Sequence, residues 1–176
     1  MKTEFELKVL DVDVEVVKAK LEGLGAELVA IFNQKRFTYD INPKTKDKWI
    51  RLRSDGRQTT LCFKSIESDK IDGTKEVEFE VPNFEAANEF LECIGIPSKQ
   101  YQENRRTRYL LDGVEIDIDE WPLIPPYIEI EANNEQEVLQ MVKKLGLENE
   151  KVTSANTQDV YKMYGIDLAK IKDLRF

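Results

Sequence analysis

Residues 4–9 read Glu-Phe-Glu-Leu-Lys-Val, with a charged side chain at every second position. Successive side chains of a β-strand point to opposite faces, so this alternation predicts a strand with one charged face and one apolar face. The pattern returns along the chain and predicts about eight strands in all. The other seven stretches are residues 36–41, 49–54, 59–64, 75–81, 105–111, 114–119 and 127–131.

Helical spacing of apolar residues separates some of these strands. Three such stretches follow an Asp or Asn that can cap a helix N-terminus, and each ends at a glycine that suits a helix C-terminus. Two shorter helices are predicted at Gln158–Tyr164 and Leu168–Leu174. The capping positions are Asp13, Asn83 and Asn133–Asn134, and the terminal glycines are Gly25, Gly95 and Gly146.

The charged faces of the strands are unusual because most of them carry acids alone or bases alone. Glu76, Glu78 and Glu80 share one face, for example, whereas Arg51 and Arg53 share another. A solvated face is the ordinary explanation for any single strand. For the whole set, a closed barrel of about eight strands explains the pattern better, with charged residues inside and apolar faces outside under the helices. The sequence thus predicts a single α+β domain over residues 1–176, an eight-stranded antiparallel β-barrel with a charged lumen and helices on its outer surface.

Composition excludes several kinds of chemistry. The 176 residues include no histidine and two cysteines, which excludes histidine-based catalysis, zinc clusters and a disulfide framework. A bound metal is therefore expected to be a hard cation with oxygen ligands, Mg²⁺ or Mn²⁺. The net charge of −8 disfavours nucleic-acid binding through a broad basic face. Without an apolar membrane span or a secretory leader, we expect a cytoplasmic protein that contacts neither nucleic acid nor membrane.

A charged lumen also constrains the ligand. Opposed acids and bases in a confined space are costly unless they pair with one another or hold a ligand. Separate clusters of each sign suit a polyphosphate with its divalent metal, since carboxylates bind the metal while Lys and Arg bind the phosphates.

The ordered set of charged motifs resembles the CYTH superfamily, the triphosphate tunnel metalloenzymes. Its elements are Glu4-x-Glu6-x-Lys8, Arg51-x-Arg53, Lys64, the Glu76/Glu78 strand, Arg106, Asp119 and Glu129-x-Glu131. The resemblance implies metal binding by Glu4, Glu6, Asp119, Glu129 and Glu131. It implies phosphate binding by Lys8, Arg51, Arg53, Lys64 and Arg106, with Arg108 nearby on the same strand.

The chain departs from the family pattern at two places. Asn104 stands where relatives often carry a base two residues before Arg106, and Val160 stands before Tyr161 where a Ser-Tyr element is common. Within the predicted machinery, Lys8, Arg53, Lys64 and Glu78 are the expected catalytic residues. Glu78 would position the attacking water, or serve instead as a structural partner of Lys64 or Arg53. The part played by the inward-facing Trp49 is open.

Three functions remain open from the sequence. The first is hydrolysis of a small-molecule triphosphate: inorganic triphosphate, ATP or thiamine triphosphate. The second is class IV adenylyl cyclase activity, in which the ribose 3′-hydroxyl attacks the α-phosphorus of ATP. The third is a non-catalytic polyphosphate- or nucleotide-binding module, which the many carboxylates disfavour. A monomer and a homodimer are both compatible with the sequence.

Overall fold

The structure is a computed structural model that describes residues 1–41, 45 and 47–176. The strands are β1 (Lys2–Leu10), β2 (Glu27–Asp40), β3 (Lys48–Ser54), β4 (Thr59–Ile66), β5 (Thr74–Glu80), β6 (Gln100–Leu111), β7 (Val114–Glu120), β8 (Tyr127–Ala132), β9 (Lys151–Thr153) and β10 (Asp173–Leu174). The helices are α1 (Val14–Gly23), α2 (Phe84–Cys93), α3 (Glu135–Lys144), α4 (Thr157–Met163) and the short 3₁₀ helix η1 (Leu168–Lys170).

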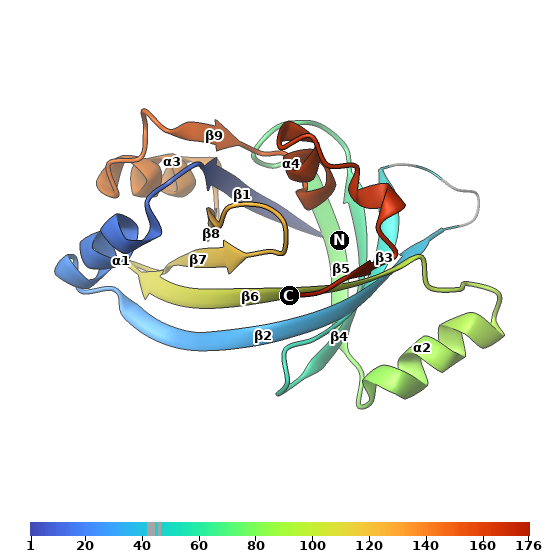
Figure 1. Ribbon diagram of the computed structural model, residues 1–176. Coiled ribbons are helices and arrows are strands. Elements are labelled where there is room, and N and C mark those ends of the chain that lie inside the picture. The colour runs from blue at the N-terminus through green and yellow to red at the C-terminus, as the bar shows by residue number, and fades with distance from the viewer. Residues whose placement is uncertain (42–44, 46) are drawn as a thin grey trace.

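Eight of the described strands close into an antiparallel barrel. Their order around it is β6, β2, β3, β4, β5, β1, β8 and β7, and pairing between β6 and β7 completes the circle. β1 therefore lies between β5 and β8, two strands that are distant from it in the sequence (Figure 1). Two short strands lie outside this circle: β9 pairs with β1, and β10 runs parallel to β6. The predicted α+β barrel is confirmed.

The principal core lies outside the barrel, beneath helices α1 and α3. Outward-facing residues of β1, β6, β7 and β8 pack there against Val17 and Leu21 of α1 and against α3. Ile116 and Ile130 in this layer are fully buried. Figure 1 shows α1 and α3 toward one end of the barrel and α2 toward the other. The apolar faces of these four strands are thus covered from outside, and their charged faces line the lumen.

Two smaller apolar clusters cover other parts of the barrel, whereas the outer face of β5 stays exposed at Val77 and Phe79. Phe84 and Leu91 of α2 pack on Tyr39 and Leu52 of β2 and β3. The C-terminal segment, with α4 and η1, packs on Leu10 of β1 and on the β7–β8 connection. No helix in the described part of the chain is long and apolar enough to cross a bilayer.

The structure extends and corrects some predicted elements. The predicted strand over residues 36–41 is the last part of β2, which begins at Glu27. The helix predicted at Leu168–Leu174 is wrong in part, because only residues 168–170 form a helical turn and residues 173–174 form β10. The three long helices begin after Asp13, Asn83 and Asn134, as predicted, and Gly25, Gly95 and Gly146 adopt positive φ beyond their ends.

Candidate active site

The barrel encloses a cavity of about 890 Å³, lined by charged side chains from β1 to β8. All the residues predicted from the sequence to form the site lie on its wall. They are Glu4, Glu6, Lys8, Arg51, Arg53, Lys64, Glu78, Arg106, Arg108, Asp119, Glu129 and Glu131. Their convergence follows from the alternation in each strand, because residues two apart share a face and that face turns inward.

Strands β1 and β8 form a wall rich in carboxylates. Glu6 lies directly opposite Glu131 in the strand register, and Lys8 lies opposite Glu129. The Lys8 ammonium contacts Glu6 at 2.9 Å and Glu129 at 3.2 Å. Burial alone would lower the pKa of Lys8, but these two carboxylates raise it well above its ordinary value. Lys8 is therefore a permanently charged base inside the barrel.

Glu4 and Lys64 form a second pair between β1 and β4. The Lys64 ammonium donates to both carboxylate oxygens of Glu4, at 2.8 and 2.7 Å, and lies 3.4 Å from Glu76. Burial, together with the charges of Glu6 and Glu76, raises the pKa of Glu4 to about 7 in spite of Lys64. Burial would also raise the pKa of Glu76, but Lys64 and its other donors lower it to about 2.

Arg106 is the most heavily paired base of the lumen. Its guanidinium makes a bidentate contact with Asp119 at 2.7 and 2.6 Å, and also reaches Asp117 at 2.7 Å and Glu129 at 2.9 Å. Arg108 pairs with Asp117 and Glu115. A phosphate that binds Arg106 or Arg108 must therefore compete with these carboxylates.

Glu78 binds the basic residues of β3. Its carboxylate accepts hydrogen bonds from Arg51 at 2.8 Å and from the Thr60 hydroxyl at 3.1 Å, and lies 3.5 Å from Arg53. Of the two structural partners considered from the sequence, Arg53 is in contact with Glu78, whereas Lys64 pairs with Glu4 and Glu76.

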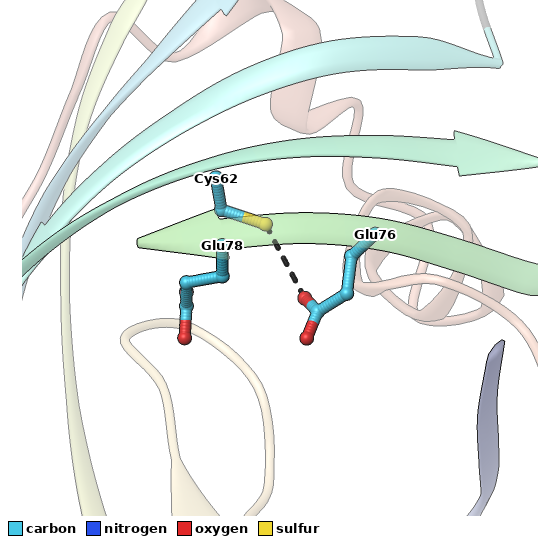
Figure 2. Close-up of side chains that lie close together, drawn as sticks. All are labelled: Cys62, Glu76 and Glu78. Atoms are coloured by element: carbon cyan, nitrogen blue, oxygen red, sulfur yellow. Dashed lines mark hydrogen bonds between the residues drawn. The ribbon is translucent and has the colours of Figure 1, made fainter. Parts of the chain in front are cut away.

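Cys62, Glu76 and Glu78 gather potential ligand atoms within 4.8 Å of one another. Figure 2 shows the three side chains on the lumen side of β4 and β5, with the Cys62 thiol donating to Glu76 at 3.2 Å. Burial raises the pKa of Cys62 to about 12, so the thiol stays protonated and is a poor ligand or nucleophile. The two carboxylates are the useful donors of this group.

Arg36 also lines the cavity, although it is not among the residues predicted from the sequence. Its guanidinium donates to the amide oxygens of Gln34 and Asn104 and stacks over Trp121, 4.6 Å from the ring centroid. A signal was present, because Phe37 and Tyr39 fill the apolar face of β2 and thereby place Arg36 on the opposite one. Asn104 of β6 thus accepts a hydrogen bond from a basic residue of the neighbouring strand, Arg36 of β2.

Two aromatic residues singled out in the sequence differ in position. Trp49 lines the cavity, on the same face of β3 as Arg51. Tyr161 is fully buried in the C-terminal cluster, where its hydroxyl donates to the carbonyl of Pro122 at 2.7 Å and its ring packs edge-on against Trp121. Tyr161 therefore supports the barrel end and does not face the lumen.

The donors on the β1–β8 wall fit a hard divalent cation. They are carboxylate oxygens, which Mg²⁺ and Mn²⁺ prefer, and Glu6 and Glu131 stand directly opposite each other. Like charges in that position repel, and a cation between the strands would relieve the repulsion. The five predicted acids each contact a Lys or Arg side chain, so a cation would have to compete with the bases for them.

The model of the CYTH domain family matches residues 2–164. This chain belongs to the CYTH family. The order of its charged motifs, the closed barrel and the charged lumen all agree with that assignment. No curated protein matches the CYTH chain in sequence.

Several solved structures share its fold. The PH1012 protein from Pyrococcus horikoshii is 26% identical, with a TM-score of 0.76 over 87% of this chain and 96% of its own. A protein described as an adenylate cyclase candidate from Vibrio parahaemolyticus is 14% identical, with a TM-score of 0.74 over 92% and 98%. HpAC1 from Hippeastrum, described as an adenylyl cyclase candidate with a dominant triphosphatase activity, is 16% identical, with a TM-score of 0.65 over 97% and 100%.

Proposed function

We propose that this CYTH protein is a divalent-metal-dependent triphosphatase that hydrolyses inorganic triphosphate or an organic triphosphate such as ATP or thiamine triphosphate. The observation that carries the proposal is the lumen itself, where carboxylates and Lys/Arg side chains line one cavity in the same barrel. Membership of a family of triphosphatases and adenylyl cyclases supports it. A site for a simple anion would need the bases but not so many acids.

Binding of the triphosphate falls to the bases of the lumen. Lys8, Arg53 and Lys64 would hold the reacting phosphates, and Arg51, Arg106 and Arg108 would hold the rest of the chain. Guanidinium groups suit this task because their planar fork makes paired hydrogen bonds to phosphate oxygens. Each base that turns to a phosphate must leave a carboxylate, as Lys64 must leave Glu4.

The carboxylates released in this way would hold Mg²⁺ or Mn²⁺. Glu4, Glu6, Asp119, Glu129 and Glu131 would supply the oxygen ligands, and the cation would provide charge neutralisation at the phosphates. Glu78 would position the attacking water, whose oxygen bonds to the terminal phosphorus as the bridging P–O bond breaks and whose proton passes to the departing phosphate oxygen. The products are phosphate and the shortened phosphate chain. Phosphoryl transfer requires mainly such positioning and charge neutralisation.

Product analysis tests this function. The protein is incubated with inorganic triphosphate, ATP or thiamine triphosphate and Mg²⁺ or Mn²⁺, and the products are separated. Release of phosphate that stops with a chelator and returns with the metal is the expected result. Cyclic AMP with pyrophosphate would establish a cyclase instead, and binding without product would establish a non-catalytic module.

Variants on one hairpin link the activity to the lumen. Arg53 faces the lumen, whereas Arg57 lies exposed in the turn between β3 and β4. Arg53→Gln should lower the rate on the order of 100-fold, the usual effect of removing one charge-stabilising donor. Arg57→Gln removes the same charge outside the cavity and should leave the rate near wild type.

A further inference from the structure

Two guanidinium groups face each other on neighbouring strands of the lumen. Arg36 of β2 is the direct register partner of Arg53 of β3, and both side chains line the cavity. Side chains that are directly opposite in an antiparallel pair lie roughly 5 Å apart at Cβ, so like charges there destabilise the sheet. The arrangement needs a source of compensating negative charge.

Glu78 supplies part of it to Arg53, at 3.5 Å, but the direct contacts of Arg36 supply none. Among the described residues, no carboxylate lies within 4.0 Å of this guanidinium; its contacts are the amide oxygens of Gln34 and Asn104 and the Trp121 ring. Arg36 is nevertheless buried, with a relative exposure of 7%. A buried charge without an ionic partner is expensive, and a bound anion would offset that cost.

Unpartnered polar atoms gather at the same place. Arg36 Nε, Thr38 Oγ1 and Trp121 Nε1 are buried without a hydrogen-bond partner, and all three residues line the cavity. Each of these atoms can donate a hydrogen bond. A ligand rich in acceptor oxygens, such as a phosphate group, would satisfy donors that the protein leaves unused.

The electrostatics of the two arginines agree with this geometry. Burial and the charges of Arg51, Arg53 and Arg106 lower the pKa of Arg36 well below its ordinary value, although the charge of Asp119 acts against them. The charge of Arg51, together with burial, lowers the pKa of Arg53 to about 10. Lys8 and Arg106 differ, because their carboxylate partners raise their pKa values. On the positive β2–β3 wall, Glu78 thus pairs with Arg51 and Arg53, whereas Arg36 has no carboxylate in contact.

We propose that Arg36 is a further substrate-binding residue, which together with Arg53 holds one phosphate group of the polyphosphate on the β2–β3 wall. In the circular strand order, this wall lies opposite the carboxylate wall of β1 and β8. The phosphate held by Arg36 is therefore the one farthest from the β1 and β8 carboxylates, whereas Asp119 of β7 lies nearer and is linked to Arg36 through Asn104. The assignment rests on the proposed function, because it requires a polyphosphate in the lumen.

Binding and stability measured together test the assignment. Arg36→Gln removes the buried charge, and Lys35→Gln is the matched control, since Lys35 is the next residue of β2 and faces outward to Glu85. We measure the Kd for inorganic triphosphate and for pyrophosphate by calorimetry with Mg²⁺, and thermal unfolding without ligand. Arg36→Gln should weaken triphosphate binding roughly 10- to 100-fold, the value of a charge-assisted hydrogen bond, and reduce the preference for triphosphate over pyrophosphate.

Without ligand, Arg36→Gln should not lose stability. It should unfold at the same temperature as wild type or higher, because an unneutralised buried charge is lost. The control Lys35→Gln should bind triphosphate with the affinity of wild type. Arg36→Lys keeps the charge without the planar fork and should bind with intermediate affinity.

The alternative outcomes separate the two proposals. Wild-type affinity in Arg36→Gln, with a lower unfolding temperature, would make Arg36 a structural partner of Trp121 and overturn this assignment alone. A wild-type protein that binds neither triphosphate nor pyrophosphate would overturn the proposed function and the Arg36 assignment together.

Discussion

Adjacent residues of β1 serve opposite sides of the barrel wall. Glu6 faces the lumen, whereas Leu7 is packed in the outer core with 6% exposure. Glu6→Gln removes one of two carboxylates that oppose each other across β1 and β8, so we expect a folded protein with metal-dependent activity reduced at least about 10-fold. Leu7→Asp buries a charge beneath the helices and should cost about 3 kcal/mol or more.

Chemical denaturation and one activity assay per variant check this contrast. An active Glu6→Gln protein together with a stable Leu7→Asp protein would mean that the charged faces are ordinary solvent-exposed surface.

Glu4 should make the stability depend on pH. Its pKa in the folded protein is raised to about 7, so between about pH 4.5 and 7 the native state retains a proton that the unfolded chain has lost. The free energy of unfolding contributed by this group is therefore highest at acidic pH and falls as pH rises through 7. Glu76 contributes its own change only at lower pH, because its pKa is lowered to about 2.

Urea denaturation of wild type and Glu4→Gln across about pH 5 to 8 isolates the contribution of Glu4 to the free energy of unfolding, since every other group is common to both proteins. The difference in unfolding free energy should change with pH in favour of Glu4→Gln as pH rises. A constant difference across the range would contradict the raised pKa.

At the scale of the element, α3 illustrates how one cap secures the outer layer. Asn134 accepts a hydrogen bond from the Glu137 backbone and donates one to its carboxylate, which fixes the first turn of the helix that covers β1, β7 and β8. Asn134→Ala should cost about 1 kcal/mol in unfolding free energy. Asn133→Ala, one residue earlier and outside the cap position, should cost less than about 0.5 kcal/mol.

The elements that sequence reasoning found are those whose periodicity matches their burial. Glu4–Val9 alternates because one face meets the lumen and the other meets the core, and the caps at Asp13 and Asn83 are local signals. The first half of β2 was missed because Leu28, Val29 and Ile31 are all exposed there, and an irregularity between Leu28 and Ala30 breaks the alternation. Local periodicity does not identify a strand of that kind.

The site likewise has features that local periodicity predicts and features that it does not. Which side chains face the lumen follows from alternation within each strand, so the predicted residues converge on one cavity. Which acid meets which base depends on register and on strand order around the barrel, as in the contact of Arg106 with Glu129 of β8. The juxtaposition of Arg36 and Arg53 likewise arises only from the β2–β3 register.

For the whole molecule, the paired lumen predicts that metal and triphosphate bind cooperatively. A triphosphate alone must draw bases such as Lys8 away from Glu6 and Glu129, and leaves those carboxylates unpaired. A cation alone leaves the bases unpaired. When both are bound, the cation pairs with the carboxylates and the triphosphate pairs with the bases. The rise in unfolding temperature with Mg²⁺ and triphosphate together should therefore exceed the sum of the separate rises. The comparison uses a substrate that is not turned over, such as a non-hydrolysable triphosphate analogue, and additive shifts would contradict the expectation.

The place of β1 in the barrel has a consequence for biosynthesis. β1 leaves the ribosome before its partners β5 and β8, and β8 is complete only at residue 132. Until then the β1 edge that pairs with β8 lacks its native partner, and such edges are sites of mispairing between nascent chains. Closure joins segments far apart in sequence and is correspondingly slow. We therefore expect the barrel to close only after residue 132 has left the ribosome, with the β1–β8 pairing as the last to form.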